Sequence, residues 1–247
     1  MAQLDKHNQL FGGLGDLVFK QVNGKTIVQL KPGKNGVKQS QPTKLSASDF
    51  GTASSTTKRL SISLRSLFHT YYDSQMYNRF RKTVYQAMLH NTEILKGQKD
   101  LWEGDISLLD GFEFNLDSLY TDYCMATINC SLSPANEIRL DIGEFNPKSQ
   151  LRWPKKTHKA ELCFLVSTYT KENYTPKESE IFKVEVSSFS PPIAAQSFTT
   201  SSLSSNCLVL ISSCVLYFKN DSVMGDISLN HKKLHPAKIE KALKILS

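Results

Sequence analysis

The sequence predicts an α+β fold: an N-terminal β-hairpin plus two helices, then an antiparallel β-sandwich of about seven strands with a short C-terminal helix. Three observations support this prediction. Two β-prone runs flank an Asn-Gly pair at 23–24, apolar residues recur at helical spacing between residues 42 and 90, and apolar and polar residues alternate after residue 125. Alternation with period two is typical of antiparallel strands that are buried on one face.

The hairpin is predicted over residues 16–30, where two short runs rich in β-branched and aromatic residues flank Asn23 and Gly24. An Asn-Gly pair tolerates the positive φ angles of a type I′ turn, which is the turn that joins two strands most directly. Glycines at 12, 13 and 15 before the hairpin, and Pro32-Gly33 after it, mark its expected ends. A polar, basic loop is expected to follow over residues 34–41.

Two helices are predicted between residues 42 and 90. Pro42 is compatible with the first turn of a helix, and an apolar stripe at i, i+4, i+7 and i+11 follows it. That stripe consists of Leu60, Leu64, Leu67 and Tyr71. Gly51 and the residues at 53–57 are weak helix formers, so we expect a break there. The second helix, over residues 74–90, places Met76, Phe80, Val84 and Met88 along one face.

The remainder of the chain is predicted to be β-rich. The polar segment Thr92–Asp105 has two glycines and no periodicity, so it is expected to be a linker. We therefore expect two domains: residues 1–95, a basic hairpin-helix region, and residues 96–247, an antiparallel β-sandwich domain. Strands are expected near 112–114, 126–132, 137–142, 159–170, 181–186, 193–200, 206–219 and 222–229. Because no helices interrupt them, two stacked sheets are favoured. The spacing of Ile239, Leu243 and Leu246 predicts a terminal helix over 236–246.

Composition indicates a globular protein of a reducing compartment, and we expect a cytoplasmic location. The 247 residues are 40% hydrophobic, which is enough for a sizeable core. Five cysteines form an odd set without any Cys-x-x-Cys pair, so buried free thiols are expected. No hydrophobic signal core follows Met1, and the longest nearly apolar run, at 207–218, is far shorter than the roughly 20 residues that cross a bilayer. We therefore expect no transmembrane segment.

Positive charge is concentrated at the start of the chain. Residues 1–95 contain 13 Lys and Arg against 5 Asp and Glu, whereas residues 96–247 contain 17 against 18. A one-sided field of this kind favours polyanions or acidic partners. The candidate partner- or nucleic-acid-binding residues are Lys20, Lys25, Lys31, Lys34, Lys38, Lys58, Arg59, Arg65, Arg79, Arg81 and Lys82. The alternative is that these charges only solvate the surface.

No catalytic, metal-binding or cofactor-binding pattern stands out. The sequence has no nucleophile elbow, no His-Glu-x-x-His, no Walker loop and no kinase signature. The glycines at 12–15 lack the preceding strand and following helix of a phosphate-binding loop. His231 and His235 have helical spacing, but Pro236 disfavours a helix there. We therefore expect no cofactor, no metal site and a non-enzymatic role.

The segment Gly12-Gly-Leu-Gly-Asp-Leu-Val-Phe, with Gly24-Lys-Thr-Ile-Val, Lys31-Pro32 and Ser48-x-Phe50-Gly51 after it, resembles the start of a widespread family of bacterial proteins. Members open with Gly-x-Leu-Gly-Asn/Asp-x-Val, a Gly-Lys hairpin and a Lys-Pro exit, followed by a helical stretch and a β-rich remainder. The resemblance covers residues 12–69 most specifically. It implies no activity, ligand or catalytic residue, only that the hairpin is a functional part.

Three functions remain open on the sequence alone, of which an enzyme with an unrecognised pocket in the sandwich loops is the least favoured. The first is a structural or interaction protein that docks onto a protein partner, or onto a neighbouring copy, through its basic hairpin-helix region, since open strand edges can accept or donate strands. The second is a nucleic-acid-binding protein that uses the same basic surface. A two-stranded ribbon or a helix can enter a major groove, and lysines and arginines release counterions from phosphates.

Overall fold

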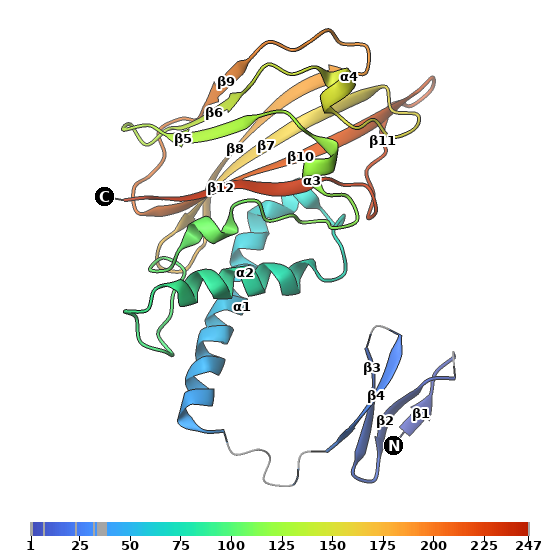
Figure 1. The fold of residues 1–247 in the computed structure, drawn as a ribbon, viewed down its shortest axis with the longest axis vertical. Coiled ribbons are helices and arrows are strands. Elements are labelled where there is room, and N and C mark those ends of the chain that lie inside the picture. Colours follow the sequence, from blue (N-terminus) through green and yellow to red (C-terminus); the bar gives the residue numbers. More distant parts are fainter. Residues whose placement is uncertain (1, 7, 23, 32, 34–38, 247) are drawn as a thin grey trace. The chain divides into compact units, whose positions relative to one another are not determined.

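The computed structural model describes residues 2–6, 8–22, 24–31, 33 and 39–246. It has the predicted α+β character, with helices and antiparallel sheets in one chain (Figure 1). The chain divides into two compact units, residues 1–44 and 45–247. This division differs from the one expected at residue 95, because both long helices pack within the second unit.

The first unit is a four-stranded antiparallel sheet in the order β1 (Ala2–Leu4), β2 (Leu10–Leu14), β3 (Leu17–Val22) and β4 (Lys25–Leu30). Strands β3 and β4 are the predicted hairpin, and Gly24 in their turn has a φ of 75°, which glycine adopts without steric cost. The glycines at 12 and 13 precede this hairpin, as expected, and form part of β2. Asn23, Pro32 and the expected loop residues 34–38 lie outside the described residues.

The two predicted helices are α1 (Gln41–Phe68) and α2 (Met76–His90). Helix α1 continues through Gly51, so the expected break is wrong. Its hydroxyl side chains donate to carbonyls one turn earlier, as Ser54 does to Phe50 (2.8 Å) and Thr57 to Ala53 (2.7 Å). These side chains therefore satisfy their hydrogen bonds without leaving the helix.

The second unit contains two antiparallel sheets. The larger sheet consists of β7 (Lys159–Thr170), β8 (Pro176–Ser187), β10 (Cys207–Asp221), β11 (Gly225–Ser228) and β12 (Ala237–Ile245). The smaller sheet consists of β5 (Ile128–Leu132), β6 (Ile138–Ile142) and β9 (Gln196–Thr199). Three short helices, η1 (Ile106–Leu109), α3 (Tyr120–Tyr123) and α4 (Pro147–Gln150), lie in the connections.

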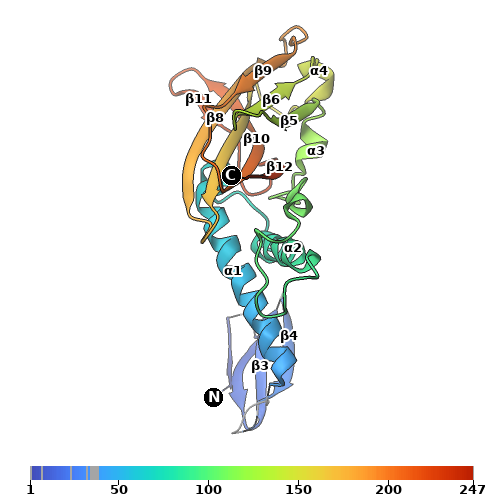
Figure 2. The same cartoon turned by 90° about the vertical axis from the view of Figure 1, so that its left-hand side faces the viewer.

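The second unit has three layers, because the larger sheet is covered on both faces. On one face, residues of β7 and β10 such as Leu162 and Val209 pack against the smaller sheet. On the other face, Leu165 and Leu210 pack against α1 and α2. Figures 1 and 2 show the smaller sheet layered on the larger one. The expected sandwich is therefore present in part, as eight strands in the described chain with a helical layer added.

The predicted C-terminal helix is wrong, because this segment is strand β12. It pairs with β10 from Cys207↔Ile245 to Cys214↔Ala237, with a bulge between Ile211 and Ser212. At the bulge, Glu240 is an extra residue that shifts the period-two alternation by one position. That shift produces an apolar spacing that resembles a helix in the sequence.

The segment expected to be a linker is integrated into the second unit. Leu101 and Trp102 are buried in the core between the helices and the larger sheet. The backbone N–H of Gly97 donates to the Asp49 carboxylate of α1 at 2.9 Å. This packing explains why the unit boundary falls at residue 44 rather than at residue 95.

All five cysteines are free, as predicted, and all except the partly exposed Cys130 are buried. None of the helices in the described part of the chain combines the length and apolar character that crossing a bilayer requires.

Candidate functional site

The predicted basic residues fall into two groups, one in each unit. Lys20 lies on β3, Lys25 begins β4, and the ammonium of Lys31 donates to the Gly15 carbonyl at 2.8 Å. Lys34 and Lys38 lie outside the described residues. The other six are on the long helices of the second unit: Lys58, Arg59 and Arg65 on α1, and Arg79, Arg81 and Lys82 on α2.

Three of the helical cations converge on one cavity of about 130 Å³ between α1 and α2. Its lining residues are Ser54, Thr57, Lys58, Arg65, Tyr77 and Arg81. The helix period explains this convergence, since residues four and seven apart share a face. Lys58 and Arg65 are seven apart on α1, and Tyr77 and Arg81 are four apart on α2.

The cations of this cavity have no carboxylate partners among the described residues. Arg81 instead donates to the Asn78 side-chain oxygen at 2.9 Å, and its guanidinium carbon lies 4.7 Å from the centroid of the Phe50 ring. Ser54 and Thr57 use their hydroxyl hydrogens on helix carbonyls, so they offer the cavity only acceptors. Recognition of an anion there would depend on Lys58, Arg65 and Arg81.

Two other candidate residues hold the fold together. The Arg59 guanidinium donates to the backbone carbonyl of Asn173. Arg79 forms an ion pair with Asp73, donates to the Glu113 carbonyl at 2.9 Å and stacks over Phe112. The Arg79 contact helps hold the pKa of Asp73 below its usual range, against the opposing effect of burial. Because these guanidinium groups are engaged within the chain, they are poor candidates for partner contact.

The first unit contributes a second candidate surface, which the sequence did not reveal. Register places side chains of one face in rows across the strands, such as Leu14, Leu17 and Leu30, or Gly12, Phe19 and Val28. We call this the apolar sheet face; it consists of Ala2, Leu4, Leu10, Gly12, Leu14, Leu17, Phe19, Gln21, Thr26, Val28 and Leu30. Lys20 and Lys25 lie on the opposite face, in register with Ile27 and Val22.

The apolar sheet face is uncovered within its own unit. Exposed fractions reach 72% for Leu30, 63% for Leu4 and 61% for Leu14. No described residue of the first unit is buried. Residues 17–21 and 26–30 do not alternate strictly, since Leu17, Val18 and Phe19 are consecutive apolar residues, so the face is defined only once the strands are paired.

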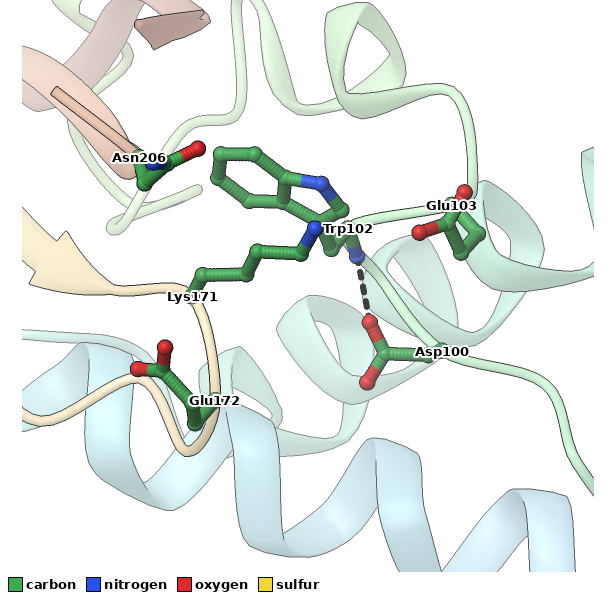
Figure 3. A pocket seen from close by; sticks show the side chains of 6 residues that line it. All are labelled: Asp100, Trp102, Glu103, Lys171, Glu172 and Asn206. Carbon is green, nitrogen blue, oxygen red and sulfur yellow. Dashed lines mark hydrogen bonds between the residues drawn. The ribbon is translucent and has the colours of Figure 1, made fainter. Parts of the chain in front are cut away.

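A larger pocket of about 550 Å³ lies elsewhere in the second unit (Figure 3). Its lining residues are Asp100, Trp102, Glu103, Lys171, Glu172 and Asn206. Asp100 accepts hydrogen bonds from the Trp102 backbone N–H (2.7 Å) and the Tyr174 hydroxyl (2.6 Å). The Lys171 ammonium lies 5.0 Å from the centroid of the Trp102 ring. Because the ring and the central carboxylate already have partners in the chain, this pocket points to no ligand.

The chain matches no known protein-family model, no curated protein and no solved structure. Any functional assignment therefore rests on the geometry described above.

Proposed function

We propose that this chain is a non-enzymatic interaction protein that assembles with a second copy of itself through its N-terminal sheet. The observation that supports the proposal is the apolar sheet face, which no part of its own unit covers. With strands spaced about 4.8 Å apart and a rise of about 3.3 Å per residue, the face extends over roughly 300 Å². Apolar patches of this size on single proteins are often functional.

A second copy fits this face for two physical reasons. A small sheet with no buried side chain is only marginally stable alone, and a second layer packed about 10 Å away would give it a core. The face also carries no charged side chain, so two identical faces meet without repulsion under two-fold symmetry. Lys20 and Lys25 then remain on the outer surfaces, in water.

The test is the solution mass of the full chain, measured by size-exclusion chromatography with light scattering. Leu17 pairs with both Leu14 and Leu30 within one row of the face, so Leu17→Asp is expected to convert a dimer into a monomer. Gln29→Asp adds the same charge on the opposite face, where Gln29 pairs with Val18, and is expected to leave the dimer intact. A monomeric wild-type chain, or a dimeric Leu17→Asp variant, would contradict the proposal.

A second readout separates loss of the interface from loss of the sheet. Amide hydrogen exchange of the wild-type chain is expected to slow in β2, β3 and β4 as concentration rises through the dimerisation range, because dimerisation stabilises these strands. Exchange that does not change with concentration, in a protein whose mass does change, would place the interface elsewhere.

The cavity between α1 and α2 favours a second candidate function, the binding of nucleic-acid phosphates. Lys58, Arg65 and Arg81 are three cations without ion pairs in the described chain, and a cavity of about 130 Å³ has room for one phosphate group. Each phosphate contact adds about 0.9 to the slope of log affinity against log salt for duplex DNA. Arg65→Gln and Arg81→Gln are therefore expected to reduce this slope.

Filter binding of DNA and RNA at a series of salt concentrations tests this candidate. The matched control is Lys82→Gln, which removes an exposed charge from α2 outside the cavity. Retention that does not depend on salt, or an equal effect of Lys82→Gln and Arg81→Gln, would exclude a phosphate site in this cavity.

A further inference from the structure

Two cysteines from different strands meet on the helix-covered face of the larger sheet. Cys163 of β7 and Cys214 of β10 are direct register partners on paired strands. Both belong to the core between the sheet and the helices. Adjacent residues on paired strands have Cβ atoms about 5 Å apart, so the two sulfur atoms can reach a single small ligand.

The two thiols lie at a cavity rather than in solid packing. The cavity has a volume of about 210 Å³ and is lined by both cysteines with Ser66, Leu67, His69, Leu165, Ile181, Lys183 and Leu216. Figure 2 shows the C-terminal end of α1, which contributes Ser66 and Leu67, beside the edge strand β8, and His69 follows directly after α1. Cys163 and Cys214 keep 5% and 2% of their surface exposed, and Ile181 keeps 57%. A small ion can therefore enter along β8.

Positive charge lies next to the thiol pair. Lys183 of β8 is the register partner of Cys163, so Cys214, Cys163 and Lys183 form one row across three strands. The Lys183 ammonium lies 3.2 Å from Glu161 and lines the same cavity. The neighbouring Cys214 thiol, helped by Lys183, holds the pKa of Cys163 below its usual range, while the Cys163 thiol and burial raise the pKa of Cys214.

We propose that Cys163 and Cys214 form a two-coordinate site for a soft monovalent metal ion of the Cu(I) class. Thiolates select soft ions, and no group of three or more His, Cys, Asp and Glu side chains in the described chain is arranged to hold a metal. Binding releases one proton from each thiol and leaves a bis-thiolate complex of net charge −1. The Lys183 ammonium, which also pairs with Glu161, partly offsets that charge.

The test is an anaerobic Cu(I) titration of the full chain against a chromogenic Cu(I) chelator. The wild-type chain is expected to withdraw one more equivalent of Cu(I) than either Cys163→Ser or Cys214→Ser. Cys124→Ser and Cys207→Ser are matched controls, because each removes a buried thiol that lies outside the cavity. The affinity is expected to rise by up to about 100-fold per pH unit while both thiols are protonated, because two protons leave.

A second measurement uses only the wild-type chain, so that a misfolded variant cannot decide the result. N-ethylmaleimide labelling is read by peptide mass spectrometry with and without one equivalent of Cu(I). Cu(I) is expected to slow labelling at Cys163 and Cys214 at least tenfold relative to its effect on Cys124, Cys130 and Cys207. Equal protection of all five cysteines, or Cu(I) uptake that survives Cys163→Ser and Cys214→Ser, would overturn the proposal.

Discussion

The carboxylate of Asp49 accepts a hydrogen bond of 3.0 Å from the backbone N–H of Lys99. Its second oxygen accepts the backbone N–H of Gly97 at 2.9 Å, and the Asp49 side chain is completely buried in α1. One carboxylate thus satisfies two backbone donors of the segment that follows α2. This relationship fastens residues 92–105 to the helical layer.

Replacing Asp49 by alanine is expected to destabilise the protein by about 2–4 kcal/mol, because it leaves two backbone N–H groups buried without acceptors. Urea denaturation followed by circular dichroism measures the change. The control is Asp117→Ala, since Asp117 is exposed. Equal midpoints for the two variants would show that the buried carboxylate contributes no stability.

His235 is expected to make the protein acid-sensitive. Burial lowers its pKa from 6.5 to about 4, and its neutral ring is held by the Leu67 carbonyl on Nε2 and the Asn230 amide on Nδ1. The unfolded chain takes up this proton at pH 6.5 and the folded chain only at about 4. Stability is therefore complete above pH 6.5 and is lost as pH falls towards 4, by about 3 kcal/mol.

Denaturation midpoints between pH 4 and pH 7 test this expectation. His235→Gln is expected to flatten the pH dependence, whereas His231→Gln, which alters an exposed histidine, is expected to retain it. A profile that is as steep in His235→Gln as in the wild-type chain would assign the acid sensitivity to other groups.

Two glycines of the second unit are expected to respond in opposite ways to alanine. A Cβ atom at Gly104 would lie 2.3 Å from the backbone carbonyl oxygen of Ala87, whereas one at Gly51 meets nothing within 4 Å. Gly104→Ala must therefore displace the end of α2 and is expected to cost more than 2 kcal/mol. Gly51→Ala lies inside α1 and is expected to add about 0.5–1 kcal/mol. Thermal denaturation of both variants shows whether each substitution raises or lowers the stability of the protein.

The hydroxyl of Tyr169 joins the larger sheet to α1. It donates to the Leu60 carbonyl at 2.9 Å and also contacts the Ser63 hydroxyl, and its side chain is wholly buried. Tyr169→Phe is expected to cost about 1–2 kcal/mol, since the Leu60 carbonyl and the partly buried Ser63 hydroxyl lose a partner. Tyr85→Phe is the control, because no described residue hydrogen-bonds the Tyr85 hydroxyl. Similar free energies of unfolding for both variants would contradict this role.

Local patterns were sufficient where an element depends on its own residues. Strand β7 at Lys159–Thr170 has the predicted bounds, and the hairpin begins one residue after its predicted start, because turn chemistry and alternation are visible in short windows. Helix α2 follows from one apolar stripe in the same way. For strand β12 the sequence wrongly predicts a helix, because the bulge at Glu240 is defined only by the pairing of β12 with β10.

The candidate site shows the same limit. The sequence identified the cations on α1 and α2, but the packing of the helices decided that Lys58, Arg65 and Arg81 share a cavity. Packing also decided that Arg59 and Arg79 are engaged within the fold. Side chains on separate helices are brought together by core contacts, and no spacing within either helix contains that information.

By itself, the sequence determined the elements with short-range signals, the excess of cations before residue 95, and the free state of its thiols. Only the tertiary structure decided that Leu101 and Trp102 belong to the core, that the first sheet presents an uncovered apolar face, and that Cys163 meets Cys214. The physical reason is that local propensities act between neighbours in the chain. Register and packing are set by contacts between residues far apart in sequence, whose energies no single segment expresses.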